Sequence, residues 1–164
     1  MRKIYIIAHD MRSTHNVGSL FRTAEGLGID KLFLTGYTPY PKTIADTRLP
    51  HIANKLDSQI QKTSLNAQHS LDWQYQESVK DVIASLRKAG VKIVALEQTD
   101  TAVALHRYQT QGDIAIILGT EVTGLPKEIL QLTDEQIIIP MFGKKESFNV
   151  VQAAAMAMYQ LRFY

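Results

Sequence analysis

Apolar residues in the first third of the chain follow two different spacings. Residues 3–8 form a run rich in isoleucine, which is typical of a β-strand. Residues 16–27 carry apolar side chains at helical spacing and predict a helix that ends at Gly28. The apolar positions of this helix are Val17, Leu20, Phe21, Ala24 and Leu27. Residues 31–35 predict a second strand, and this strand–helix–strand order favours a parallel sheet covered by helices.

The middle of the chain has a weaker pattern. Prolines at positions 39, 41 and 50 interrupt residues 36–76, so we expect only short helical pieces and loops there. Residues 77–89 place their apolar side chains on one helical face and predict a helix. Residues 91–96 and 114–118 are short apolar runs of the kind found in strands buried on both faces.

The last quarter continues the alternation of turns, helices and strands. We expect a turn at 119–125, a helix at 126–132 with proline in its first turn, a strand at 136–139 and a loop at 140–147. The closing helix, residues 149–163, is apolar almost all round. A helix without a polar face is buried on more than one side. We therefore expect one of its sides to pack against a second subunit.

Composition narrows the class of protein. The 164 residues fit a single domain, residues 1–164, and 45% hydrophobic with 21% charged residues is ordinary for a globular chain. There are no cysteines, which excludes disulfides, thiolate metal sites and cysteine nucleophiles. No window is apolar over the length of a membrane helix, and the apolar run at the N-terminus is too short for a signal peptide. By default these features predict a cytoplasmic protein.

Charge adds one observation. The formal net charge is +2, but residues 1–62 carry +4 and the remainder −2. A basic first third attracts phosphates. Chance unevenness on a solvated surface explains the same numbers, so the distribution alone does not assign a partner.

Polar residues at the first strand-to-helix turn are the first candidates for chemistry. Ligands of open α/β sheets collect outside the carboxyl ends of the strands, which is where Asn16 lies. Asn16 either contacts a ligand or only caps its helix. Arg22 lies off the apolar stripe of that helix, so taken alone it is either functional or a solvated arginine.

Two later segments also follow predicted strands. In Gly119–Pro126 the glycine spacing imitates a P-loop, but Leu125 and Pro126 stand where lysine and serine or threonine are needed, so phosphate cradling is unsupported. Glu121 between the glycines faces the strand ends. In the third segment, Ser147 or Asn149 can cap the closing helix. The five histidines show no metal-ligand spacing, and the dinucleotide fingerprint of Rossmann-type enzymes is missing.

Taken together and in this order, the three segments resemble the three sequence motifs of the SpoU/TrmH family of RNA ribose 2′-O-methyltransferases, in the SPOUT superfamily. The matching residues are Asn16 and Arg22, then Gly119, Glu121, Gly124 and Leu125, then Ile139, Pro140, Met141, Ser147, Asn149 and Val150. The likeness covers essentially the whole chain. Thr14 and Val151 depart from the family, which often has proline and serine there. The flanking extensions of some relatives are missing, which leaves the RNA substrate open.

The resemblance implies a fold, an assembly and a cofactor. The fold is an α/β fold with a mostly parallel sheet flanked by helices and a deep C-terminal trefoil knot, a rare exception to the rule against threaded chains. The assembly is a homodimer. The cofactor is S-adenosylmethionine, bent among the loops of the knot. The resemblance places around it Leu96, Gly119, Ile139, Met141 and Phe148.

The resemblance also implies a reaction, methyl transfer to a ribose 2′-hydroxyl of RNA without a metal, with tRNA slightly ahead of ribosomal RNA. Arg22 activates the 2′-hydroxyl, and partners are positioned by Asn16, Glu121, Ser147 and Asn149. Arginine almost never loses its proton, so Arg22 acts either as a base or by holding the adjacent phosphate and stabilising the alkoxide. The alternative is a catalytically inactive RNA-binding protein of the same fold.

Overall fold

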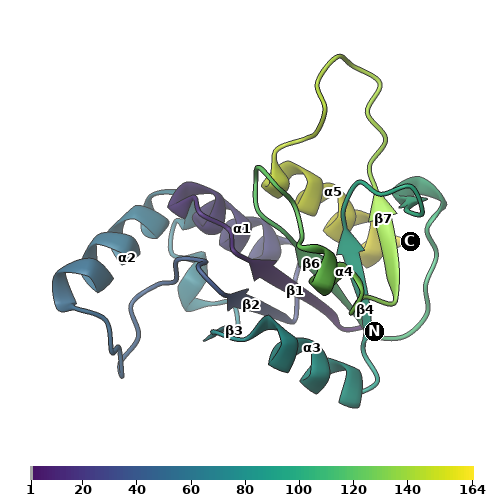
Figure 1. Ribbon diagram of the computed structural model, residues 1–164. Coiled ribbons are helices and arrows are strands. Elements are labelled where there is room, and N and C mark those ends of the chain that lie inside the picture. Colours follow the sequence, from purple (N-terminus) through teal and green to yellow (C-terminus); the bar gives the residue numbers. More distant parts are fainter. Residues whose placement is uncertain (1) are drawn as a thin grey trace.

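The computed structural model describes residues 2–164 and joins seven strands in one parallel sheet (Figure 1). The strands are β1 Ile4–His9, β2 Lys31–Thr35, β3 Trp73–Gln76, β4 Lys92–Leu96, β5 Val103–Ala104, β6 Ile114–Leu118 and β7 Glu135–Ile138. Their order across the sheet is β3-β2-β1-β6-β4-β7-β5, and every pairing is parallel. The predicted α/β fold with a parallel sheet is confirmed. The trefoil knot stays a prediction.

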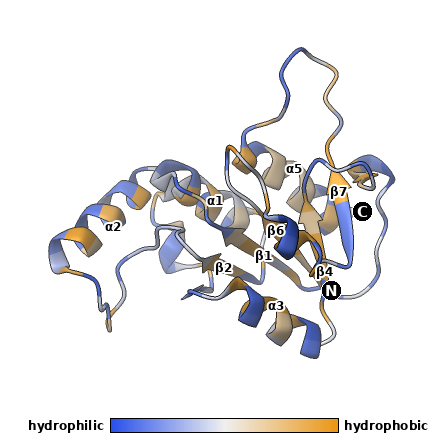
Figure 2. Cartoon of the chain, in the orientation of Figure 1, coloured by the Kyte–Doolittle hydropathy of each residue, from blue (hydrophilic) through white to orange (hydrophobic). Residues whose placement is uncertain are grey.

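Helices cover both faces of this sheet. They are α1 Thr14–Gly26, α2 Pro50–Ser64, α3 Val79–Lys88, α4 Lys127–Leu130 and α5 Val150–Phe163, with short 3-10 turns η1 Ala67–His69 and η2 Leu105–Arg107. Side chains of α1 and α5 share one apolar cluster with Ile6, whereas α3 and α4 share the other with Ile7. Successive strand residues point to opposite faces, which explains why neighbours enter different clusters. Figure 2 shows hydrophobic colour along the central strands and large hydrophilic stretches on α2 and α3.

The expectation of only short helical pieces and loops in residues 36–76 is wrong. Pro50 begins the 15-residue helix α2 rather than breaking one, because proline is tolerated in a first turn. Only Ala53, Ile60 and Ser64 of α2 are buried, so too few apolar residues repeat at helical spacing for the sequence to predict this helix. The helix docks on α1 at Gly18, where any added Cβ would overlap Thr63 and the backbone of Ile60.

Several predicted boundaries also need correction. α1 begins two residues earlier than expected, and Ser13 caps it by accepting a hydrogen bond from the Asn16 N–H (3.2 Å). Asn16 therefore lies inside the helix and is not its N-cap. The helix predicted at 126–132 is the single turn α4. Asn149 caps α5 by accepting from the Val151 N–H (2.9 Å), so the cap is Asn149 and not Ser147.

The closing helix α5 is buried on one side only within a single chain. Its inner face carries Val151, Ala154, Ala157, Met158 and Leu161. Its outer face leaves Met156, Tyr159 and Phe163 exposed, with the last two rings 4.8 Å apart. Among residues 2–164, no helix has both the length and the apolar character needed to cross a membrane.

Candidate functional site

A cavity of about 340 Å³ lies at the carboxyl ends of β4, β6 and β7. Its walls are the turns that follow β4 and β6 and both ends of the long loop between β7 and α5, which rises above the sheet in Figure 1. The lining residues are Leu96–Gln98, Leu118–Gly124, Ile138, Ile139, Glu146–Phe148, Val150 and Ala153. The volume is that of a site for a small organic molecule.

The lining of the cavity has one sign of charge. Glu97, Glu121 and Glu146 contribute carboxylates, and no lysine, arginine or histidine is among the lining residues. None of the other lining residues carries a charge. Charge of one sign in a cleft attracts ligands of the opposite sign. The cavity therefore suits a ligand that combines apolar surface with positive charge, and it disfavours a polyphosphate.

Two glycines give the turn after β6 its shape. A Cβ on Gly119 would overlap the carbonyl carbon of Gly124, because the backbones of the two ends of the turn touch. Thr120 and Gly124 exchange two backbone hydrogen bonds of 3.2 Å across the turn. Gly124 has a φ of +67°, which side-chain-bearing residues rarely adopt. Only glycine fits either position without moving the cavity wall.

Glu97 ties this turn to the neighbouring strand end, a role that the sequence analysis missed. Its Oε2 accepts a hydrogen bond from the Leu125 N–H (2.7 Å) and its Oε1 accepts one from the Gln98 N–H (3.0 Å). The signal that was overlooked is an acidic residue directly after a buried strand. Glu97 joins the segments after β4 and β6 and so helps to fix the cavity.

Glu121 ties the same turn to the start of α1. Its Oε1 accepts hydrogen bonds from the Ser13 N–H (3.2 Å) and the Asn16 Nδ2 (3.0 Å), and its Oε2 accepts from the Arg12 N–H (3.2 Å). Asn149 completes the network by donating its Nδ2 to the Asn16 Oδ1 (3.3 Å). We name this set (Asn16, Glu121 and Asn149) the asparagine–glutamate network.

The protonation of Glu121 follows from these contacts. Burial alone would raise the pKa of Glu121, but the hydrogen bonds from the Asn16 side chain and from the backbone of residues 121, 12 and 13 together outweigh it. The pKa of Glu121 therefore lies below its ordinary value. The side chain stays anionic at neutral pH and is a weak base.

The structure brings most of the predicted site residues together. Four of the five predicted cofactor contacts line the cavity, namely Leu96, Gly119, Ile139 and Phe148. Ser147 also lines it, and Asn16, Glu121 and Asn149 form the asparagine–glutamate network beside it. Met141 is not among the lining residues. Arg22 is exposed on α1, does not line the cavity and has no side-chain hydrogen bond or ion pair within residues 2–164.

The position of the site defines a class. β1 and β6 are adjacent in the sheet, and the chain continues from β1 to β2 on one side and reaches β4 and β7 on the other. Open α/β sheets bind ligands outside the strand ends at such a reversal of strand order. Glu121 bridges the ends of these two strands. The protein is thus an α/β domain whose asparagine–glutamate network lies at its topological switch point, beside the cavity at the ends of β4, β6 and β7.

Comparison with known proteins identifies the family. The model of the SpoU rRNA Methylase family matches residues 3–159, so the chain belongs to this family. It is 27% identical over 155 residues to the tRNA (guanosine(18)-2'-O)-methyltransferase of Escherichia coli (strain K12), which covers 94% of this chain and 61% of that protein. It is 27% identical over 163 residues to the 23S rRNA (guanosine(2553)-2'-O)-methyltransferase RlmP of Bacillus subtilis (strain 168), at 98% and 58% coverage.

Solved structures agree with the fold. The AdoMet-bound rRNA methyltransferase from Sinorhizobium meliloti has a TM-score of 0.80 at 21% identity and covers 98% of this chain and 56% of that chain. A structure solved to explain the 2-OH methylation of C/U34 on tRNA has a TM-score of 0.75 at 20% identity. The match covers 98% of this chain and 89% of that chain. The chain thus spans about three-fifths of the length of the E. coli and B. subtilis relatives.

Proposed function

We propose that this protein is an S-adenosylmethionine-dependent RNA methyltransferase that acts on a ribose 2′-hydroxyl. The observation that carries the proposal is the acidic cavity, free of basic lining residues, beside the asparagine–glutamate network. Membership of the SpoU family and the RNA 2′-O-methyltransferase names of its relatives support it. We favour tRNA over ribosomal RNA, because the relatives from E. coli and Aquifex aeolicus carry tRNA names.

The cavity fits the proposed cofactor in charge and size. S-adenosylmethionine has a positive sulfonium, an ammonium and a single carboxylate, so its net charge is positive. The glutamates of the lining suit this charge, and Leu96, Ile139 and Phe148 supply apolar surface for an adenine ring. The absence of a side chain at Gly119 lets the two ends of the turn pack against each other and form this wall of the cavity. We retain Met141 as a predicted contact of the cofactor.

The chain's own residues position the reaction. When bound, S-adenosylmethionine supplies an electrophilic methyl group, so the protein has to align a ribose oxygen with it and exclude water. Glu121 is a weak base, and we therefore assign it to holding the Asn16 amide rather than to removing the 2′-hydroxyl proton. Asn149 orients the same amide from the other side, and Ser147 presents a hydroxyl at the cavity. The proposed chemistry needs no metal.

Arg22 is proposed to act on the RNA and not on the cofactor. Its side chain is exposed and has no protein partner within residues 2–164, which leaves the guanidinium available to a phosphate. Arginine stays protonated in proteins, so holding the phosphate and stabilising the emerging alkoxide is the chemically easier role. Part of its contribution then exists only in the transition state.

The first experiment measures cofactor binding and the position of the methyl group. Calorimetry should detect S-adenosylmethionine and not ATP, because of the acidic lining. Labelled methyl transferred to undermodified RNA should protect one linkage from alkaline hydrolysis, since methylation removes the 2′-hydroxyl nucleophile. Label on a base, or binding of ATP in place of S-adenosylmethionine, would refute the proposal. RNA binding without any transfer would favour the inactive RNA-binding protein of the same fold.

The second experiment tests Arg22. Arg22→Ala should lower the single-turnover rate by roughly 10²–10³ with unchanged cofactor affinity and melting temperature. Arg22→Lys should rescue poorly, because an ammonium lacks the planar fork of the guanidinium. Lys88→Ala, at the end of α3 on the opposite face of the sheet, is the matched control and should leave the rate unchanged. A rate for Arg22→Ala within a few-fold of wild type would remove Arg22 from the mechanism.

We also propose a homodimer built on the outer face of α5. Met156 and Tyr159 line an apolar groove of α5 with Leu105, Ile139 and Pro140, and exposed apolar patches of this kind mark interfaces. Tyr159→Glu should yield a monomer by light scattering, whereas Gln152→Glu, an exposed position of the same helix, should not. Ala154 and Met158 are fully buried and would test folding instead. A monomeric wild type at micromolar concentration would contradict this assembly.

Two further expectations belong to the same proposal. All strands of residues 2–164 join one sheet, which supports a single domain. A cytoplasmic location fits the tRNA and rRNA in the names of the relatives.

A further inference from the structure

Tyr37 is an exposed aromatic residue at the carboxyl edge of the sheet. It lies two residues after β2, and 88% of its surface is accessible. Its phenol and ring have no partner within the part of the chain that the structure describes. An exposed tyrosine is ordinary on a mobile loop, so its significance depends on how firmly its backbone is held.

The backbone on either side of Tyr37 is anchored to the neighbouring strand ends. The Tyr37 N–H donates to the Asp10 Oδ1 (2.8 Å), after β1, and the Gly36 N–H donates to the Glu77 carbonyl (3.1 Å), after β3. Thr38 is 2% exposed, and its hydroxyl donates to the Ala8 carbonyl (3.0 Å). Tyr37 is therefore an exposed ring on a fixed turn.

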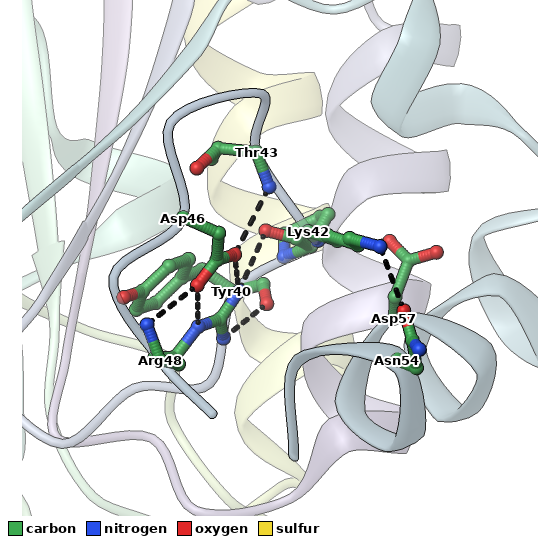
Figure 3. Close-up of polar contacts among 8 residues, drawn as sticks. Tyr40, Lys42, Thr43, Asp46, Arg48, Asn54 and Asp57 are labelled. Carbon is green, nitrogen blue, oxygen red and sulfur yellow. Dashed lines mark hydrogen bonds and ion pairs between the residues drawn. The ribbon is translucent and has the colours of Figure 1, made fainter. Parts of the chain in front are cut away.

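The rest of the β2–α2 loop, which spans residues 36–49, is held by its own side chains and by contacts of Lys42 with α2 (Figure 3). Arg48 lies 3.6 Å over the ring of Tyr40, and the Tyr40 ring stacks on Tyr75 at 4.0 Å. Figure 3 shows Arg48 and Asp46 pointing toward each other, with two ion-paired hydrogen bonds of 2.8 and 2.5 Å. None of these contacts involves the side chain of Tyr37, so that side chain is not needed to hold the loop.

Tyr37 lies on the same edge as the cavity. β6, β1 and β2 are consecutive in the sheet, so the segment after β2 is two strand spacings, roughly 10 Å, from the turn that carries Glu121. Between them lies Arg12, which follows β1, has an exposed side chain and donates its N–H to Glu121 (3.2 Å). The order along the edge is thus cavity, arginine and tyrosine.

We propose that Tyr37 stacks on a base of the RNA next to the reacting ribose, with Arg12 on the phosphate between them. The inference rests on the proposed function. Arginine and aromatic rings are the usual contacts for unpaired nucleotides. The carboxylate of Asp10 contacts the Tyr37 N–H (2.8 Å), so this point of the edge repels phosphate and leaves the base as the partner. The charged carboxylate of Asp10 beside Tyr37 also disfavours binding of an apolar protein segment here.

The test compares two oligomers that differ only in their bases. Fluorescence anisotropy measures binding of a labelled oligoadenylate and of an abasic ribose–phosphate oligomer of the same length. Tyr37→Ala should weaken binding of oligoadenylate by roughly 5- to 100-fold, and Tyr37→Phe should leave it within about twofold. Both variants should bind the abasic oligomer like wild type. Arg12→Gln should weaken the binding of both oligomers alike. It should also reduce the slope of log affinity against log salt concentration by about 1, as expected for the loss of one phosphate contact.

Controls separate stacking from general damage. Ile44→Ala removes another fully exposed side chain of the same loop and should change neither affinity. Equal losses for Tyr37→Ala on both oligomers, no loss on either, or a wild type that does not prefer oligoadenylate would each overturn the inference. Cofactor binding and methyl transfer by the wild type are measured on the same preparation. If these succeed while Tyr37→Ala has no effect, only the stacking inference fails; if they fail too, so does the proposed function.

Discussion

The two loops on either side of the switch point are held by different contacts. The turn after β6, residues 119–126, is closed by hydrogen bonds between Thr120 and Gly124 and is tied to other segments by Glu97 and Glu121. The β2–α2 loop is anchored at residues 36–38 to the ends of β1 and β3, and the contacts of Arg48 with Asp46 and the Tyr40 ring hold its second half. The first loop borders a cavity of about 340 Å³, whereas no residue of the second lines that cavity.

This difference shows how each loop is suited to its proposed role. Glu97 and Glu121 reach across the carboxyl edge of the sheet, so the wall of the cavity joins segments that are distant in the sequence. Its shape then depends on the whole carboxyl edge of the sheet. The contacts of the β2–α2 loop, with the strand ends and within itself, do not involve the cavity, so this loop keeps its shape without a ligand and can present Tyr37 on a fixed turn. Damage to the two loops should therefore have separable effects on cofactor binding and on stability.

Between these two loops, the larger expected effect comes from Gly119→Ala. The new Cβ overlaps the Gly124 carbonyl carbon, so the turn after β6 has to open, and cofactor affinity should fall roughly 10- to 100-fold. Gly143→Ala is the matched control in the β7–α5 loop, because nothing lies within 4 Å of its added Cβ. Calorimetry with S-adenosylmethionine measures both. Equal affinities for the two variants would show that the turn does not bind the cofactor.

A smaller effect, on stability, is expected from Arg48→Met. The change removes the ion pair with Asp46 and the cation from the Tyr40 ring, and should lower the free energy of unfolding by about 1–2 kcal/mol. Cofactor affinity should stay within about twofold, because no residue of the loop lines the cavity. Lys42→Met, whose amine contacts only the exposed Asn54, should cost at most about 0.5 kcal/mol. If Arg48→Met lost as much cofactor affinity as Gly119→Ala, the two loops would not have separate roles.

The smallest effect is on acid stability. The hydrogen bond from Arg48 holds the pKa of Asp46 far below its ordinary value of 3.8, and the pKa of Glu121 lies below 4.5. Because these pKa values are lowered in the folded state, the unfolded state takes up protons first as the pH falls. The stabilisation is complete above the ordinary values and is lost progressively below them.

Urea unfolding between pH ~6 and ~3 measures this loss. Glu121→Gln should flatten the fall in stability below pH 4.5, and Asp46→Asn should flatten it below pH 3.8, each by less than about 1.4 kcal/mol per pH unit. Burial also lowers the pKa of His9 from 6.5, but this contribution is common to wild type and variants and cancels in their comparison. An unchanged slope in Glu121→Gln would mean that its hydrogen bonds do not hold the turn.

Local pattern was sufficient for the central strands, whereas most of the site was predicted from the likeness of three segments to the motifs of the SpoU/TrmH family. Residues 31–35 and 114–118 are strands with the predicted bounds, because runs buried on both faces leave a continuous apolar signal. Asn16, Glu121 and Asn149 meet as their motifs indicated, because the carboxyl ends of parallel strands share one edge. The strands needed only residue types and their order, and the site residues needed the family resemblance as well.

Only the tertiary structure decided the remaining features. α2 buries few apolar side chains and depends on Gly18 of α1 for its docking, and Glu97 acquires its role only when β4 and β6 become neighbours. The physical reason is the same in both cases. A strand or an amphipathic helix is specified by side chains close in sequence, whereas a close helix crossing or a carboxylate bound to a distant backbone N–H depends on residues that meet only after folding.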